Sequence, residues 1–286
     1  MKIAIFPNLQ KENALECSRT VCDVLHQYNM ELYIDNKYYE QFEDKGYINF
    51  GMFEDFVKES EIAIAIGGDG TILKCARYLL GIKTKLLGIN TGRLGFMASL
   101  EFDELAELHS LIKGDYDIIK RMMLATRIYT GENYCENIAL NDVSIARLYS
   151  KLSDFKVYVD DNLIGTYRAD GIVISTPTGS TAYALSAGGP IIEPSLDCIE
   201  LTLLCPHSLF SRPMLFSPDR VIKIVHNVDV NPELYISIDG NDPITFNSRQ
   251  VLEVKKSAHK INLIDMKRNT FFDSLNKKLM RSIKGN

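Results

Sequence analysis

The first hundred residues alternate between short apolar runs and stretches in which apolar residues recur at helical spacing. Lys2–Phe6, Glu31–Ile34, residues 62–66 and Leu86–Ile89 are short and mostly apolar, which is typical of strands. Apolar residues at positions 14, 17, 21 and 25 mark one helix face, and those at 72, 73, 76, 79 and 80 mark another. This alternation predicts a parallel sheet covered by helices, with ligands bound beyond the carboxyl ends of its strands.

From about residue 118 the pattern becomes one of short strand-like runs. These runs are Ile138–Ile145, Phe155–Val159, Ile172–Ser175, Leu201–Leu204, Val221–Val225, Leu234–Ile238 and Val251–Val254. Asp160-Asp161-Asn162 and Asp239-Gly240-Asn241 predict hairpin turns. One helix is expected at Ser180–Ala187, and helical spacing returns at Phe271–Ile283. The second half is therefore expected to be mainly β.

The change of pattern predicts an N-terminal α/β domain over residues 1–110, a mainly β domain over 111–265 and a C-terminal helix over 266–286. The length of 286 residues and the 46% hydrophobic content suit one large or two modest globular domains. A net charge of −5 gives no basic field for nucleic acid or an anionic membrane. The six cysteines form no Cys-x-x-Cys pair, and we expect a cytoplasmic protein.

The apolar run Ile62–Ile66 leads directly into Gly67-Gly68-Asp69-Gly70-Thr71, and helical spacing follows. A strand, a glycine-rich turn and a helix N-terminus together favour an anion such as phosphate, because free N–H groups and the helix dipole both point at it. A carboxylate would repel that phosphate. Asp69 is therefore expected to take part in chemistry or to contact a metal.

A second cluster, Asn90-Thr91-Gly92-Arg93-Leu94-Gly95-Phe96, follows the strand Leu86–Ile89. Arg93 is of a type that binds anions, and Phe96 can stack on a base or pack in the core. An ordinary strand-to-loop turn would explain the same residues.

A third cluster is the polar pair Asn141-Asp142 inside an apolar run. Such groups are costly to bury without partners, and together they offer the donors and acceptors that suit a sugar diol. A bulge or a sheet edge is the simpler explanation of this pair taken alone.

The fourth cluster begins at Arg168 and Asp170 and continues, after an apolar run, with Thr176-Pro177-Thr178-Gly179-Ser180-Thr181-Ala182-Tyr183. Hydroxyl groups gather where a helix is expected to begin, and Ser180 or Thr181 is expected to cap it. Tyr183 can present its ring to a base, and Ser186 falls on nearly the same helix face as Ala182 and Tyr183. An N-capped helix without a ligand is the alternative.

Several other reaction types find no support in the sequence. The chain has no Gly-x-x-x-x-Gly-Lys-Ser/Thr loop, no Gly-x-Gly-x-x-Gly after the first strand and no His-Glu-x-x-His. Ser180 is not in a Gly-x-Ser-x-Gly elbow. Any phosphoryl transfer would therefore use another type of site.

Taken together, these motifs resemble the NAD kinase family. Five stretches carry the resemblance, in the family's order and over roughly residues 60–215: Gly67–Thr71, Asn90–Phe96, Leu140–Asp142, Asp170-Gly171 with Ser175–Tyr183, and His207-Ser208-Leu209 with Arg212-Pro213. The glycine motif alone is shared with diacylglycerol-type lipid kinases and phosphofructokinases. The Thr176–Tyr183 run beside the Asn-Asp pair is far more specific.

The resemblance implies a Rossmann-like α/β N-terminal domain, a sandwich-like β domain and a final helix that packs back on the first domain. It implies phosphorylation of the 2′-hydroxyl of the adenosine ribose of NAD to give NADP. The implied donor is ATP, another nucleoside triphosphate or polyphosphate, with a divalent cation such as Mg²⁺. Members of the family are usually homodimers or homotetramers.

The resemblance also implies roles for single residues. Asp69 would be the general base, with Gly68, Gly70 and Thr71 shaping the phosphate pocket. Asn141 and Asp142 would hold a ribose diol. The nucleotide site would further include Asn90, Phe96, Arg168, Asp170, Thr178, Thr181, Ala182, Tyr183 and Ser186. Many family members have Glu at the position of Asp142, so the reach to the diol is shorter here.

Two alternatives to an NAD kinase stay open at this point. A lipid or sphingoid kinase of the diacylglycerol kinase type could share the glycine motif, although no apolar or basic membrane-binding stretch is evident. A catalytically silent NAD(P)-binding regulator would share the nucleotide residues. Asp69 argues against the regulator, because a pure binder does not need a carboxylate beside phosphates.

Overall fold

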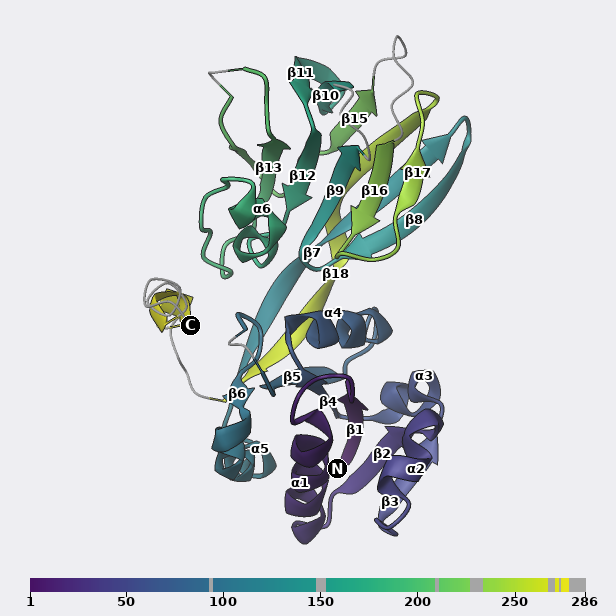
Figure 1. The fold of residues 1–286 in the computed structure, drawn as a ribbon, viewed down its shortest axis with the longest axis vertical. Coiled ribbons are helices and arrows are strands. Elements are labelled where there is room, and N and C mark those ends of the chain that lie inside the picture. Colours follow the sequence, from purple (N-terminus) through teal and green to yellow (C-terminus); the bar gives the residue numbers. More distant parts are fainter. Residues whose placement is uncertain are drawn as a thin grey trace. The chain divides into compact units, whose positions relative to one another are not determined.

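The computed structural model describes residues 1–92, 95–147, 153–208, 211–226, 234–266, 271–272 and 274–277. The chain forms two compact units, one of residues 1–120 with 261–286 and the other of residues 121–260 (Figure 1). We predicted domain boundaries at residues 110 and 265; the chain passes between the compact units at residues 120–121 and 260–261.

The first unit is built on a parallel sheet with the strand order β5-β4-β1-β2-β3. Its strands are β1 (Lys2–Pro7), β2 (Glu31–Asp35), β3 (Ile48–Gly51), β4 (Ile62–Gly67) and β5 (Lys85–Asn90), and the short β6 (Leu100–Glu101) pairs with β5. The four strands predicted here are confirmed. β4 and β5 are parallel neighbours, and Gly67 is paired with Asn90. The Gly67–Thr71 motif and the motif that starts at Asn90 therefore begin at the same edge of the sheet.

Helices connect these strands. They are α1 (Ala14–Gln27), α2 (Tyr39–Phe42), α3 (Phe53–Phe56), α4 (Asp69–Tyr78) and α5 (Leu108–Lys113). Single 3-10 turns lie at Asn36–Tyr38 and Val57–Glu59, and a longer 3-10 segment lies at Phe102–Glu107. The predicted apolar face of α1 is confirmed, since Ala14, Cys17, Val21 and Leu25 are fully buried. Cys17, Val21 and Leu25 pack against strand residues such as Ile3, Ile34 and Ile64. The Rossmann-like expectation therefore holds for this unit.

The second unit consists of antiparallel strands in two groups. One sheet has the order β14-β13-β12-β9-β16-β17, and the other group contains β11-β10-β15-β18 with β7 and β8. The strands are β7 (Asp117–Thr130), β8 (Asn133–Ala139), β9 (Asp142–Arg147), β10 (Ser153–Val159), β11 (Asn162–Ala169), β12 (Gly171–Ser175), β13 (Ile199–Leu204), β14 (Met214–Phe216), β15 (Ile222–His226), β16 (Leu234–Ile238), β17 (Ile244–Phe246) and β18 (Gln250–Asp265).

One buried cluster joins the two groups of strands. Phe155 and Val157 of β10 contribute to it from one side, and Ile145 of β9 and Ile172 of β12 contribute from the other. Apolar residues that alternate along strands and meet between two layers are the mark of a β-sandwich. The expected sandwich character of the second half is therefore confirmed.

Both predicted hairpins are present. Asp160 and Asp161 have φ of 49° and 65° between β10 and β11. Asp239 and Gly240 have φ of 50° and 69° between β16 and β17. Asp, Asn and Gly are the residues that adopt this left-handed conformation most readily, and for that reason the turn signal was reliable.

Three predictions of local structure need correction. The run at residues 138–145 is not one strand, because β8 ends at Ala139 and β9 begins at Asp142. The helix expected at 180–187 is a 3-10 turn at Gly179–Thr181 followed by a single α-turn, α6 (Tyr183–Ser186), with a break at Ala182 (φ −104°, ψ −122°). The strand expected at 251–254 extends over the 16 residues of β18.

The predicted C-terminal helix falls largely outside the described residues. Residues 271–272 and 274–277 are helical, and Leu275 is buried. Residue 273 and residues 278–283, the rest of that prediction, are not described. The return of this helix to the first domain stays a prediction.

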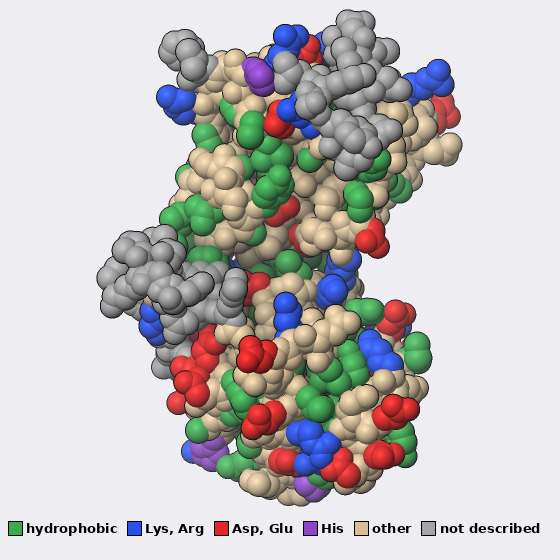
Figure 2. Space-filling model, viewed as in Figure 1, with side chains coloured by type: hydrophobic (Ala, Val, Ile, Leu, Met, Phe, Trp, Pro, Cys, Tyr) green, Lys and Arg blue, Asp and Glu red, His purple; other side chains and the backbone are tan. Residues whose placement is uncertain are grey.

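Acidic and basic side chains are interspersed over the face of the molecule drawn in Figure 2. No broad area of one charge sign is visible on that face. In the described part of the chain, no helix has both the length and the apolar character needed to cross a membrane.

Candidate active site

The turn between β4 and α4 is held from within by Gly67 and Thr71. A Cβ added at residue 67 would lie 2.3 Å from Oγ1 of Thr71, so only glycine fits there. Thr71 is buried, and its hydroxyl oxygen accepts a hydrogen bond from Nδ2 of Asn8 at 3.2 Å. Thr71 thus shapes the turn from the protein side.

Gly68 and Gly70 face open space instead. A Cβ at either residue would meet no heavy atom within 4 Å. Gly68 has φ −114° and ψ −174°, which is extended backbone open to other residues. The missing side chains therefore leave room at the start of α4, where the first N–H groups of a helix have no intrahelical acceptor and the dipole favours an anion.

Asp69 is the first residue of α4, and its carboxylate has a fixed orientation. The N–H of Phe96 donates to Oδ2 at 2.9 Å, and the N–H of Met97 donates to Oδ1 at 3.1 Å. A Cβ at Gly95 would lie 2.2 Å from Oδ1, so the loop approaches the carboxylate closely only because residue 95 is glycine. The structure thus brings Asp69 and Phe96 together, as the two separate motifs suggested.

The side chain of Asn90 forms hydrogen bonds within the first unit. Its Nδ2 donates to Oε2 of Glu101 at 2.6 Å and to the carbonyl of Gly92 at 3.4 Å, and the side chain is buried. Arg93 and Leu94, which belong to the same motif, lie outside the described residues.

In the second unit, Asn141 and Asp142 lie at the junction of β8 and β9. They are 8% and 6% exposed. Oδ1 of Asn141 is buried and has no hydrogen-bond donor among the described residues. Burial raises the pKa of Asp142 to about 7, and the charges of Asp239 and Glu200 contribute to the increase. Both side chains therefore have unused capacity for hydrogen bonds from a ligand.

The Thr176–Tyr183 segment packs directly on this pair. Thr176 donates its N–H to the carbonyl of Asn141 at 2.9 Å and its hydroxyl to that of Leu140 at 2.6 Å. A Cβ at Gly179 would lie 2.1 Å from the Asn141 carbonyl oxygen, so this close approach requires glycine. Two motifs that are distant in sequence thus form one site within this unit.

The hydroxyl groups of this segment do not cap a helix as predicted. Ser180 is buried, donates to the carbonyl of Pro177 at 2.8 Å and accepts the N–H of Ile192 at 3.0 Å. Thr181 donates to the carbonyl of Thr178 at 3.2 Å. These bonds hold the turn in shape, because a helix of one turn offers little for a cap to stabilise.

Tyr183 and Ser186 are exposed, Thr181 and Ala182 are partly exposed, and Thr178 is buried. The pKa of Tyr183 is raised by the partial burial of its phenol and by the charge of Asp142, so the phenol lies near that carboxylate. Within this unit, the exposed Tyr183 thus lies near the buried pair Asn141 and Asp142.

Asp170 and Arg168 lie away from this group. β9 and β12 are antiparallel, with Ser175 opposite Asp142 and Gly171 opposite Ala146. Asp170 therefore falls at the other end of β12, roughly 13 Å along a strand of this length. There it pairs with Nη2 of Arg147. The structure does not bring Asp170 and Arg168 together with Asn141 within one chain.

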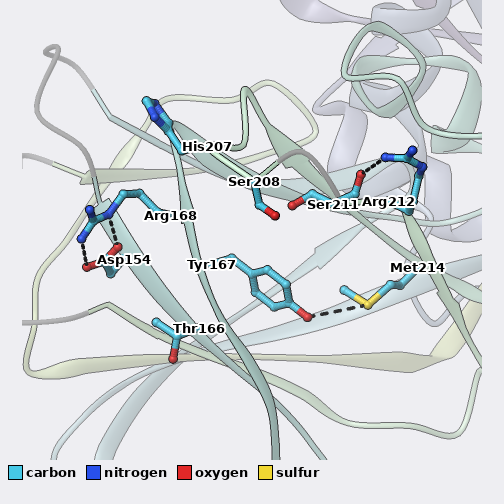
Figure 3. Close-up of a pocket in the computed structure, with 9 residues that line it drawn as sticks. All are labelled: Asp154, Thr166, Tyr167, Arg168, His207, Ser208, Ser211, Arg212 and Met214. Atoms are coloured by element: carbon cyan, nitrogen blue, oxygen red, sulfur yellow. Dashed lines mark hydrogen bonds and ion pairs between the residues drawn. The ribbon is translucent and has the colours of Figure 1, made fainter.

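Arg168 lines a pocket of about 900 Å³ in the second unit (Figure 3). Its guanidinium forms two hydrogen bonds with Asp154, at 2.8 and 3.0 Å. The other lining residues are Asp154, Thr166, Tyr167, His207, Ser208, Ser211, Arg212 and Met214. Of the predicted site residues, only Arg168 belongs to this pocket, and its charge is already matched by a carboxylate.

Sequence reasoning missed several residues that hold the site together. Glu200 is fully buried in β13 and accepts hydrogen bonds from Ser175 at 2.9 Å and Thr202 at 2.7 Å. Glu200 lies inside the apolar run Ile199–Leu204, just as Asn141 and Asp142 lie inside an apolar run. A polar side chain in such a run is costly to bury without partners, so this signal could have been found in the sequence. Asp239 was interpreted only as a turn residue, and its carboxylate contacts the 140–142 segment.

The described residues contain no group of three or more His, Cys, Asp or Glu side chains that could enclose a metal ion. This donor set does not fit a Mg²⁺ ion held by the protein alone. It is compatible with the usual way in which enzymes bind Mg²⁺, through substrate phosphates and one or two carboxylates.

A carboxylate held beside an open helix start, with a separate polar pair suited to a sugar, is compatible with phosphoryl transfer to a hydroxyl group. The fold and these residues fit a nucleotide-dependent phosphotransferase. Residues 3–116 match the ATP-NAD kinase N-terminal domain and residues 140–266 match the ATP-NAD kinase C-terminal domain. The chain belongs to the NAD kinase family.

Curated relatives agree with this assignment. The chain is 39% identical to an NAD kinase of Caldanaerobacter subterraneus subsp. tengcongensis over 282 residues, which cover 97% of this chain and 98% of that protein. It is 38% identical to an NAD kinase of a Thermoanaerobacter species, with the same coverage. These relatives give no support to a lipid kinase.

Two solved structures share the fold. One is a yeast NADH kinase complexed with NADH, with a TM-score of 0.90 and 23% identity, covering 98% of this chain and 87% of that one. The other is an NAD kinase from Archaeoglobus fulgidus in complex with ATP, with a TM-score of 0.75 and 22% identity, covering 98% and 99%.

Proposed function

We propose that this chain transfers the γ-phosphoryl group of ATP to the 2′-hydroxyl of the adenosine ribose of NAD, giving NADP and ADP. The observation that carries this proposal is the fixed carboxylate of Asp69 at the open start of α4. Membership of the NAD kinase family supports the choice of substrates.

Asp69 is the proposed general base. The oxygen of the 2′-hydroxyl forms a bond to the γ-phosphorus, the bond from that phosphorus to the β,γ-bridging oxygen breaks, and the hydroxyl proton passes to Asp69. Because two backbone N–H groups hold the carboxylate, it needs little reorientation as the proton moves. Each oxygen keeps a second lone pair for the substrate hydroxyl.

Asn141 and Asp142 are the proposed ribose contacts. The buried, unpaired Oδ1 of Asn141 and the carboxyl group of Asp142 can form hydrogen bonds with a ribose diol. The proton of the 2′-hydroxyl is the one that passes to Asp69. Phe96, Thr178, Thr181, Ala182, Tyr183 and Ser186 are proposed to line the nucleotide site. Arg168 and Asp170 stay in the proposal as nucleotide contacts, although they lie at the other end of β12.

The proposed phosphoryl donor is ATP or polyphosphate. A divalent cation such as Mg²⁺, held chiefly by the donor phosphates, would neutralise charge on the transferring group. We further propose that the enzyme works in the cytoplasm as a homodimer or homotetramer. All six cysteines are free thiols, which fits a reducing compartment.

The direct test is the purified protein with NAD, Mg²⁺ and a panel of donors that includes ATP and polyphosphate. NADP formation is read with an NADP-specific dehydrogenase. We expect NADP with ATP. No NADP with any donor would refute the proposal.

The first prediction concerns Asp69→Asn, which keeps the shape of the side chain and removes the base, although its NH₂ group replaces one of the two oxygens that accept backbone N–H groups. General-base catalysis contributes about 10²–10⁴ in rate, so kcat should fall by that order while NAD binding is largely kept. Asp55→Asn, at an exposed carboxylate in α3 of the same unit, is the matched control. Near-normal turnover of the Asp69→Asn variant would exclude Asp69 as the base. If the wild-type protein bound NAD but showed no turnover, a catalytically silent regulator would be favoured.

A further inference from the structure

Asp239 makes an unusual set of contacts with the site. It is the first residue of the β16–β17 turn. Its carboxylate accepts three consecutive backbone N–H groups. Oδ2 accepts that of Leu140 at 2.8 Å, and Oδ1 accepts those of Asn141 at 2.7 Å and Asp142 at 3.1 Å. The N–H of Asp239 in turn donates to the carbonyl of Asp142 at 2.9 Å.

These hydrogen bonds account for the break between β8 and β9. Along a regular strand, successive N–H groups point to alternate sides, so three in a row cannot reach one acceptor. The carboxylate of Asp239 therefore holds residues 140–142 in a bend. Hydrogen bonds to an ionised acceptor are about twice as strong as neutral ones, which suits this purpose.

The same bend is held from its carbonyl side by a different segment. Thr176 donates to the carbonyls of Leu140 and Asn141, and Gly179 lies against the latter. Asp239 thus binds the N–H groups of a three-residue segment that contains Asn141 and Asp142. The direction of those two side chains depends on the bend, because a shift of one residue in a strand reverses the face of each side chain.

We propose that Asp239 is a positioning residue for the ribose of NAD: its carboxylate sets the bend at residues 140–142 and so aims Asn141 and Asp142 at the diol. This inference rests on the proposed ribose contacts of that pair. Asp239 itself needs no contact with substrate. Its loss should weaken NAD binding while the binding of ATP and the stability of the sandwich are largely kept.

Two variants separate the carboxylate from the backbone conformation. Asp239→Asn keeps the shape and tolerates the left-handed φ of 50°, but it presents an N–H group to at least one of the three donors. Asp239→Gly keeps the φ and removes both acceptor oxygens. Asp242→Asn changes a charge in the same turn at an exposed side chain and is the matched control.

We expect Asp239→Asn to raise the KM for NAD and its dissociation constant by about tenfold or more, in line with loss of a charge-assisted hydrogen bond. The KM for ATP should change less than about twofold, within the range of a surface substitution. Asp242→Asn should match the wild type. Unchanged NAD affinity in both Asp239 variants, equal weakening of NAD and ATP, or failure of both variants to fold would each overturn the proposal.

A double-variant cycle tells this proposal apart from the ribose contact on which it rests. If Asp239 acts through Asn141, Asp239→Asn should weaken NAD binding much less in an Asn141→Ala background than in the wild type. Additive losses would contradict action through Asn141. If Asn141→Ala alone leaves NAD binding unchanged, the ribose contact itself is wrong, whatever Asp239 does.

Discussion

Asp142 is a buried carboxyl group with other carboxylates close to it. Asp239 faces it from the end of β16, Glu200 from β13, and the Tyr183 phenol from α6. Burial is the largest cause of its raised pKa of about 7, against an ordinary 3.8. The ionised form that a ribose hydroxyl would prefer is therefore costly to keep in the folded protein without a ligand.

This leads to a prediction about pH. Between about pH 4 and pH 7, folded Asp142 holds a proton that the unfolded chain has released, so its contribution to stability decreases as the pH rises through that window. Asp142→Asn removes this titration. Its melting temperature, relative to that of the wild type, should be higher at pH 8 than at pH 4, and NAD should bind more weakly.

Thermal unfolding of both proteins from pH 4 to pH 8, with calorimetric titration of NAD, checks this prediction. Asp242→Asn, an exposed carboxylate, should show no such difference between the two pH values. A difference in melting temperature between Asp142→Asn and the wild type that stays constant over the range would contradict the raised pKa.

At the scale of elements, the start of α4 and the loop at residues 95–97 form one unit of structure. The loop donates two N–H groups to the side chain of the first helical residue, Asp69. The loop can come this close because Gly95 has no Cβ. The position of the proposed base thus depends on a residue that is distant in sequence.

We therefore predict that Gly95→Ala impairs catalysis through Asp69. Its Cβ would fall 2.2 Å from Oδ1, so the carboxylate or the loop must move. A displacement of about 1 Å in a catalytic group can cost about 10²-fold in rate, and kcat should fall by that order while NAD affinity changes little. Gly46→Ala, where a Cβ would meet nothing within 4 Å, is the control. Equal kcat values for the two variants would show that the contact does not matter.

At the scale of the whole molecule, ligand binding should increase the stability of the folded protein. A ligand that binds only the folded state stabilises it by about 2.7 kcal/mol at a concentration of 100 times its dissociation constant. NAD at such a concentration should therefore raise the melting temperature of the wild type. Asn141→Ala removes a proposed ribose contact, and its shift at the same NAD concentration should be much smaller.

The control for this prediction is ATP, whose stabilising effect should be alike in the wild type and in Asn141→Ala. A variant that NAD stabilises as much as it does the wild type would contradict the role given to Asn141. Loss of both shifts would point to general damage to the fold.

The sequence by itself determined the two kinds of fold and the motifs of the site. Strands such as β1, β4 and β5 and the helix α1 were predictable because their apolar spacing is local and regular. The two hairpin turns were predictable because Asp, Asn and Gly have intrinsic backbone preferences. Family-specific motifs then pointed to Asp69 and to the Asn141-Asp142 pair.

Only the tertiary structure decided how those residues are held. The break at Leu140 and Asn141 depends on a carboxylate almost a hundred residues later in the chain. The helix predicted at 180–187 breaks at Ala182, after a turn whose buried Ser180 bonds to Ile192. The separation of Asp170 from Asn141 follows from the antiparallel register of β9 and β12. Local pattern carries no information on such contacts, because they join side chains and backbone groups that only folding brings within hydrogen-bond distance.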